Sequence, residues 1–221
     1  MIDTRSRLVA TAERLLAARG VEAVSLREIS RESGSRNAMA TQYHFGDRAG
    51  VVAAIIGKHQ PAVEAARHAL LDQYEAAGTG GLRDLAGALV RPLATKLADH
   101  DGGPEFLQIY AEILDRTAGP PGSLASMTRW RALVDPWLEP EAVRLHRRYT
   151  AIVHSAVELG RRARTGPHTD DRLFISYLVD VVTAILSAPV SGETRRLADE
   201  RDQVVGRSGT PTGRGGRTTP A

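Results

Sequence analysis

Residues 25–45 read SLREISRESGSRNAMATQYHF, and this stretch decides the fold. Ser25 and Glu28 have the S-x-x-E spacing of a capping box, in which two side chains satisfy backbone N–H groups at the start of a helix. Leu26 and Ile29 lie three residues apart, on the same face, as a short helix that faces a core requires. A first short helix is therefore predicted to begin after Ser25.

A glycine turn and a polar helix are predicted to follow. Gly34 ends the first helix because glycine adopts a left-handed backbone at little cost, and Ser35 or Asn37 caps the next helix. The second helix ends near His44, and its exposed polar side chains are Arg36, Asn37, Gln42, Tyr43 and His44. Amides suit adenine edges, and guanidinium groups suit guanine or phosphate. This is the plan of a helix-turn-helix, although spacing alone equally allows a surface helical hairpin without a ligand.

The sequence around this pair resembles the N-terminal module of the TetR family of transcriptional regulators. The resemblance covers residues 20–55 and rests on four features: Gly20 after the first helix, the serine-capped second helix, the aromatic-His-Phe signature at residues 43–45, and the capped, basic start of a fourth helix at residues 46–48. One departure is that the segment from Gly34 to Phe45 is one residue longer than the commonest family spelling. The resemblance favours DNA binding over the hairpin without a ligand.

The resemblance implies an all-α fold in three parts. Residues 1–46 would form a three-helix helix-turn-helix DNA-binding head, and residues 47–200 a helical body that binds an effector and dimerises, entered through a long fourth helix. Residues 201–221 are rich in Gly, Thr, Pro and Arg, so we expect a disordered tail. The function implied is a homodimeric repressor, which binds a palindromic double-stranded DNA operator and is released by an unknown small-molecule effector.

By analogy with the family, eight residues are expected to contact DNA: Arg27, Arg36, Asn37, Ala40, Gln42, Tyr43, His44 and Arg48. The last three would mainly hold phosphates. Asn37, Ala40 and Gln42 would face bases. The net charge of the chain is +3, and residues 1–60 hold nine Lys and Arg against six Asp and Glu, so the whole excess lies at this end. A basic head suits phosphate contact.

Helical periodicity continues through the rest of the chain. Asp47 begins the long fourth helix, in which Pro61 predicts a kink or break near residues 58–60. In the segment 171–187 the polar residues after the first turn form one narrow stripe, so this helix is expected to be buried on nearly all sides. With the preceding helix, 141–163, it would build the dimer interface, unless it is the central helix of a monomeric bundle. The expected interface residues are Ile152, Ala156, Leu159, Phe174, Tyr177, Leu178, Val181, Val182 and Ile185.

An effector pocket is expected between the body helices, where small-molecule sites often lie. Its candidate lining consists of the large amphipathic side chains of the body: Tyr74, Phe106, Tyr110, Trp130, Trp137, His146 and Tyr149. Each of these side chains also suits ordinary core packing. The sequence does not identify the effector.

Other chemistry is absent from the sequence. The chain has no cysteine, which excludes disulfides and thiolate metal sites and fits a cytoplasmic location. We find no signal peptide and no apolar run that could span a bilayer, so no membrane partner is expected. The histidines lack metal-binding spacing, and nucleophile-elbow and phosphate-loop motifs are missing. We therefore expect no enzyme, metal or cofactor. The main alternative is a helical ligand-binding or interaction protein without specific DNA binding.

Overall fold

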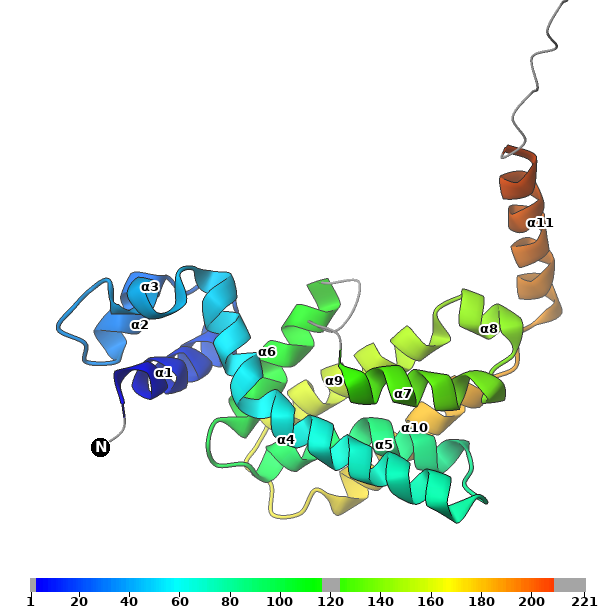
Figure 1. Ribbon diagram of the computed structural model, residues 1–221, viewed down its shortest axis with the longest axis horizontal. Coiled ribbons are helices and arrows are strands. Elements are labelled where there is room, and N and C mark those ends of the chain that lie inside the picture. Colours follow the sequence, from blue (N-terminus) through cyan, green and yellow to red (C-terminus); the bar gives the residue numbers. More distant parts are fainter. Residues whose placement is uncertain (1–2, 117–123, 209–221) are drawn as a thin grey trace, which may run out of the picture.

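The computed structural model describes residues 3–116 and 124–208, without the side chains of Asp115 and residues 204–208. Every regular element in that part of the chain is helical, which confirms the all-α prediction. The first three helices are α1 (Thr4–Arg19), α2 (Leu26–Glu32) and α3 (Ala40–Phe45). They form a small unit, which we call the head, at one end of an elongated molecule (Figure 1).

The remaining helices form a connecting rod, a larger bundle and a projecting helix. The rod is α4 (Arg48–Ala77). The bundle, which we call the body, contains α5 (Leu82–Ala94), α6 (Gly103–Arg116), α7 (Ala125–Val134), α8 (Pro140–Arg144), α9 (Arg147–Arg164) and α10 (Arg172–Ser187), with short 3-10 turns at Thr95–Ala98 and Asp135–Trp137. The last helix, α11 (Gly192–Ser208), points away from the body in Figure 1.

Helix α4 runs from the head to the far end of the body. Asp47 caps it, because its Oδ1 accepts a hydrogen bond from the Gly50 N–H at 2.8 Å. A Cβ at Gly50 would lie 1.9 Å from the Phe45 carbonyl oxygen, so only glycine allows α3 and α4 to meet this closely. The helix is continuous across Pro61, and Figure 1 shows it changing direction along its course. Of the kink or break predicted near residues 58–60, the break is therefore absent.

The body is built around the pair α6 and α9. Their backbones approach closely at Gly160, where a Cβ would lie 2.9 Å from the Cβ of Ala111. Helices α4 and α10 pack on α5, and α10 also packs on α9. The largest side chains with no or almost no exposed surface include Phe106 and Trp130. A continuous hydrophobic core therefore extends through the body.

Two predicted boundaries were wrong. The helix expected at 141–163 is two helices, because His146 adopts a left-handed backbone, φ 58°, between α8 and α9. Residues 201–208, expected to be disordered, continue α11. The start of α11 is tied to the body by Arg195, which pairs with Glu139, and by the buried Ala198. The rest of the predicted tail, residues 209–221, lies outside the described part of the chain.

The predicted dimer residues fall into two groups. Ile152, Ala156, Leu159, Leu178 and Val182 are at most 5% exposed within one chain. They belong to the core of the body because α10 buries one face against α5 and α9. Their prediction as interface residues was wrong. Tyr177 is 66% exposed, and Phe174, Val181 and Ile185 are half-buried. These four remain candidates for a dimer interface.

No single helix in the described ranges has both the length and the apolar composition needed to cross a membrane; α10 and the beginning of α11 pass that test only together, as a bent pair.

Candidate nucleic-acid interface

Helices α2 and α3 are held together by two buried hydroxyl groups. The Oγ atoms of Ser30 and Thr41 lie 2.8 Å apart, and Ser30 Oγ also accepts the Thr41 backbone N–H at 3.0 Å. Both side chains are fully buried. A buried polar pair that satisfies its own hydrogen bonds fixes the angle between two helices, since either hydroxyl alone would be left unsatisfied. The sequence gives no sign of this pair, because serine and threonine also suit caps and surfaces.

The start of α2 forms only half of the predicted capping box. Ser25 Oγ accepts the Glu28 N–H at 3.2 Å, as expected. The Glu28 carboxylate pairs with Arg19 of α1 rather than with the Ser25 N–H. The hydrogen bond from Arg19 lowers the pKa of Glu28. The glutamate therefore ties α2 to α1 instead of capping its own helix.

The segment between α2 and α3 is longer than the sequence suggested. Helix α3 begins only at Ala40, so residues 33–39 form the connection and Arg36 and Asn37 lie in it rather than on a helix. Gly34 has φ +71°, as the turn prediction requires. Asn37 Oδ1 accepts the Met39 N–H at 2.9 Å, which organises the chain just before α3. The predicted start of the second helix at residues 35–37 was therefore wrong.

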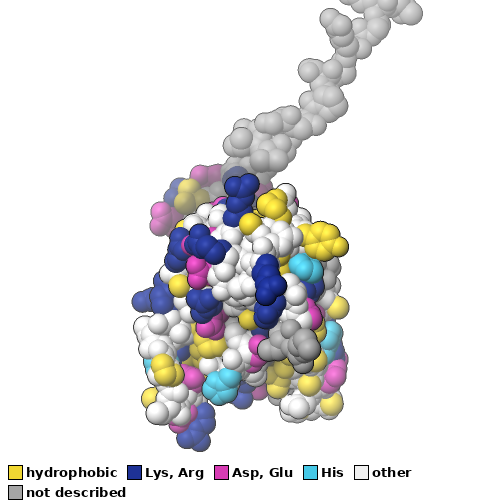
Figure 2. Space-filling model, turned by 90° about the vertical axis from the view of Figure 1, so that its left-hand side faces the viewer, with side chains coloured by type: hydrophobic (Ala, Val, Ile, Leu, Met, Phe, Trp, Pro, Cys, Tyr) yellow, Lys and Arg dark blue, Asp and Glu magenta, His cyan; other side chains and the backbone are white. Residues whose placement is uncertain are grey.

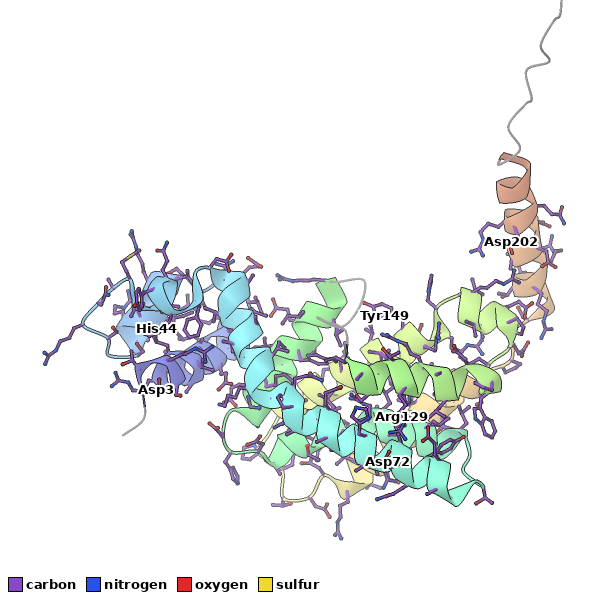
Figure 3. All side chains as sticks on the ribbon, in the orientation of Figure 1. Asp3, His44, Asp72, Arg129, Tyr149 and Asp202 are labelled. Atoms are coloured by element: carbon purple, nitrogen blue, oxygen red, sulfur yellow. The ribbon has the colours of Figure 1, made fainter. Side chains whose placement is uncertain are left out.

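The outer face of α3 presents polar and aromatic side chains. Gln42, Tyr43 and His44 are exposed, Tyr43 to 83% of its surface. The Tyr43 and His44 rings meet edge to face, with centroids 5.3 Å apart. His44 lies in the head, at the end of the molecule remote from α11 (Figure 3). Met39, which the sequence analysis did not select, is 41% exposed beside them.

Two predicted DNA contacts face the protein instead. Ala40 is only 5% exposed and packs in the core of the head, because the first turn of α3 lies against α2. The Arg48 guanidinium pairs with Glu22, and its Nη2 donates to the Val24 carbonyl oxygen at 3.1 Å. Arg48 therefore joins α4 to the connection between α1 and α2. The predictions that Ala40 faces bases and that Arg48 holds phosphate are not supported by these positions.

Several arginines of the head are left without partners. Arg27 and Arg36 are exposed, and neither has a hydrogen bond or ion pair to another described residue. Arg7 and Arg14 of α1 are unpaired in the same sense. Figure 2 looks at the head end-on and shows Lys and Arg side chains spread over it. Unpaired guanidinium groups beside an exposed amide and phenol can donate to phosphates and base edges together.

A buried charge cluster joins this head to the body. Glu13 of α1 is 2% exposed, and its carboxylate binds His59 Nε2 and Lys58 Nζ of α4, both at 2.9 Å. Lys58 also binds Asp101 at 2.9 Å, and these two carboxylates raise its pKa although burial opposes the rise. His59 stacks on Phe106 of α6, with centroids 4.7 Å apart. A movement of the body helices would therefore reach α1 through α4.

A second contact between head and body lies at Val21, just after α1. The Val21 N–H donates to both carboxylate oxygens of Glu112 in α6, at 3.1 and 3.2 Å. Arg116 Nη2 binds the same carboxylate at 2.9 Å, and its Nη1 lies 3.4 Å from Glu22. The head is thus attached to α6 as well as to α4, and its position depends on both helices.

The seven side chains predicted to line an effector pocket do not gather around one cavity. Phe106, Tyr110 and Trp130 are at most 6% exposed and pack in the core, where Trp130 Nε1 donates to the Leu85 carbonyl oxygen at 2.8 Å. Trp137 is 48% exposed. These side chains were predicted as one set because all are large and amphipathic. That shared property does not place them around one cavity.

The other three members of the set lie elsewhere. His146 is exposed at the junction of α8 and α9, and Tyr149 donates to the Leu114 carbonyl oxygen at 2.9 Å. Tyr74 receives a hydrogen bond from Trp137 Nε1 at 3.2 Å and faces a surface groove between α4 and α5. None of the described cavities is therefore lined by more than one of the seven residues, and Tyr74 is that one.

Over the described residues, no group of three or more His, Asp or Glu side chains is arranged to hold a metal ion. Compared with known proteins, the chain matches no family model and no curated protein sequence.

Proposed function

We propose that the protein is a homodimeric, one-component transcriptional regulator of TetR type, a repressor that acts in the cytoplasm. The observation that carries the proposal is the exposed, unpaired set Arg36, Gln42 and Tyr43, displayed by α3 and the connection before it. Hydrogen-bonding side chains that are exposed and have no partner within the protein are available to bind another molecule. The second helix of a helix-turn-helix enters the major groove of DNA, and α3 occupies that position in the chain.

Two copies would meet through α10. Leu173 and Tyr177 lie one turn apart on that helix and are 82% and 66% exposed, which is unusual for large side chains without a partner. A two-fold dimer would place two heads on successive major grooves, about 34 Å apart, and would bind a palindromic operator. Sedimentation equilibrium measures the molar mass directly, and a monomer at micromolar concentration would contradict this part of the proposal.

Regulation would act through the ties between head and body. A small molecule that favours one position of α4 and α6 shifts the spacing of the two heads, because a ligand acts only through different affinity for two states. Glu13 and Glu112 lie at the two points where such a movement would reach α1.

The test is selection of bound sequences from random DNA with the purified chain at a stated salt concentration. The wild type should enrich a palindrome, and the variant Gln42→Ala/Tyr43→Ala should bind the enriched and a scrambled sequence alike. The matched control is Leu145→Ala/Thr150→Ala, which changes two exposed body residues and should leave enrichment intact. Failure of the wild type to enrich any sequence would refute specific DNA binding.

A second candidate function has its own support. The seven-residue connection and the internally paired Arg48 depart from the expected head, which favours a helical ligand-binding or interaction protein without specific DNA binding. Equal affinity of wild type and variant for selected and scrambled DNA would favour this alternative.

A further inference from the structure

A groove of about 330 Å³ lies between the C-terminal half of α4 and α5. The two helices run antiparallel, joined by the short loop after Gly78 (Figure 1). The groove is lined on the α4 side by Gln73 and Tyr74, and on the α5 side by Arg83, Gly87 and Arg91. Its volume lies within the range of about 300–1,000 Å³ that small-molecule sites occupy.

Arg91 brings an uncompensated charge into this groove. Among the described arginines between residues 49 and 203, only Arg91 and Arg131 have neither a hydrogen-bond nor an ion-pair partner. The neighbouring Arg83 is different, because it pairs with Asp180 of α10 at 2.7 Å. The carboxylate of Asp84 is also engaged, since its Oδ2 accepts the Gly81 N–H at 2.8 Å. Arg91, which is exposed to solvent, is therefore the guanidinium of the groove lining that has no protein partner, while the Asp84 carboxylate lies in the same lining.

The shape of the groove depends on a missing side chain. A Cβ at Gly87 would lie 3.2 Å from Arg91 Nε, so the arginine side chain lies over the glycine, and both residues line the groove. On the opposite wall the Tyr74 ring packs against Gly80, where a Cβ would lie 2.5 Å from two ring carbons. Trp137 Nε1 donates a hydrogen bond to the Tyr74 hydroxyl at 3.2 Å. The walls are thus fixed by packing and hydrogen bonding.

We propose that this groove binds a small organic anion, whose carboxylate or phosphate oxygens pair with Arg91. A guanidinium group offers a planar fork of donors that matches either oxyanion. The apolar part of the ligand would lie on Leu70, Ala77 and Ala88, which line the same groove. The binding does not depend on the function proposed above; only an effect of the anion on DNA binding would rest on it, through α4, which carries the head at its other end.

The experiment is isothermal titration calorimetry of the full chain, without DNA, with three probes: benzoate, phenyl phosphate and inorganic phosphate. We expect saturable binding of benzoate or phenyl phosphate in the micromolar to millimolar range. Preference for benzoate identifies a carboxylate ligand, and preference for phenyl phosphate identifies a phosphate ester. Inorganic phosphate should bind more weakly than phenyl phosphate, because it has no apolar part to bury.

Two variants and a matched control locate the site. Arg91→Ala should weaken binding by about tenfold or more, since it removes a charge-assisted hydrogen bond. Gly87→Ala keeps the arginine but displaces its Nε by a few tenths of an ångström, and should weaken binding less than Arg91→Ala does. Arg131→Ala removes the other unpaired body arginine and should leave affinity unchanged. Circular dichroism checks that all three variants fold.

Two results would overturn the proposal: no saturable heat with any of the three probes, or an equal loss of affinity in Arg91→Ala and Arg131→Ala. Because the titrations contain no DNA, either result is independent of whether the protein binds an operator. Conversely, if the protein fails to bind DNA and still binds benzoate through Arg91, the proposed regulatory function would be refuted and the proposed anion site would stand.

Discussion

The head and the body use arginine differently. In the body, guanidinium groups join helices: Arg67 is buried against Glu64 and Ser126, and Arg129 of α7 binds Asp72 and Glu75 of α4 (Figure 3). In the head, Arg27 and Arg36 are exposed and have no partner among the described residues. Most described arginines of the body are therefore paired, with Arg91 and Arg131 as the exceptions, whereas Arg27 and Arg36 of the head remain available to a partner.

Among the substitutions that compare paired with unpaired arginines, the largest loss of stability is expected at Arg67. Its side chain is 5% exposed, burial lowers its pKa, and its Nη1 binds Glu64 at 3.1 Å and Ser126 at 2.9 Å. Arg67→Ala leaves the Glu64 carboxylate without its counter-charge, so we expect the free energy of unfolding to fall by about 3–5 kcal/mol. Urea denaturation followed by circular dichroism measures it.

The matched control for that measurement is Arg131→Ala, an arginine of the same region without a partner. Its effect on the free energy of unfolding should stay within about 0.5 kcal/mol. Equal losses of unfolding free energy in the two variants would show that pairing does not decide how much a body arginine stabilises the fold.

A smaller effect is expected at Asp99, which lies 3.8 Å from His59 Nδ1 of the buried charge cluster around Glu13 and binds the buried Lys96 at 2.8 Å. The hydrogen bond from Lys96 lowers the pKa of Asp99 from its ordinary value of 3.8. A carboxyl whose pKa is lower in the folded state stabilises that state above the unfolded pKa, and this stabilisation is lost as the pH falls through the folded pKa. Wild type should therefore be more stable than Asp99→Asn at neutral pH, and the two should converge below about pH 3.8.

Differential scanning calorimetry of the pair, between about pH 3 and 7, measures that convergence through the melting temperature. A difference that stays constant across this range would show that the Lys96–Asp99 bond does not contribute in the way described.

The smallest effect on stability is expected at Arg36, in the head. Arg36→Ala should leave the free energy of unfolding within about 0.5 kcal/mol of wild type, because the side chain has no partner to lose. If it contacts phosphate, the slope of log affinity for DNA against log salt should fall by about one unit. Arg161→Ala, a body arginine 71% exposed, is the matched control and should leave the slope unchanged. An equal change in both slopes would point to overall charge rather than to the head.

Local signals in the sequence were sufficient for several features. Ser25 caps α2 by accepting a hydrogen bond from the Glu28 N–H, three positions later, and Gly34 has the positive φ that a turn requires. These features depend on neighbours within one helical turn, so spacing alone predicts them. The start of α3 was predicted too early because Asn37 organises a turn before the helix rather than capping it directly.

Features that depend on distant neighbours were predicted poorly. Ala40 and Arg48 were placed on the DNA by analogy, yet the first packs in the core and the second pairs with Glu22. The effector pocket failed for the same reason, since an aromatic side chain such as Trp130 fits a core and a cavity equally well by composition. Partners far apart in the sequence, such as Glu13 and His59, gave no local signal at all.

The sequence by itself determined the helical class, the positions of caps and turns, and the polar side chains of residues 36–44, because these follow from chemistry within a few neighbouring residues. Only the tertiary structure decided which of those side chains are free, which charges are paired, and where a groove remains between α4 and α5. Burial and pairing are properties of surfaces that meet in space, and helices distant in the chain supply those surfaces.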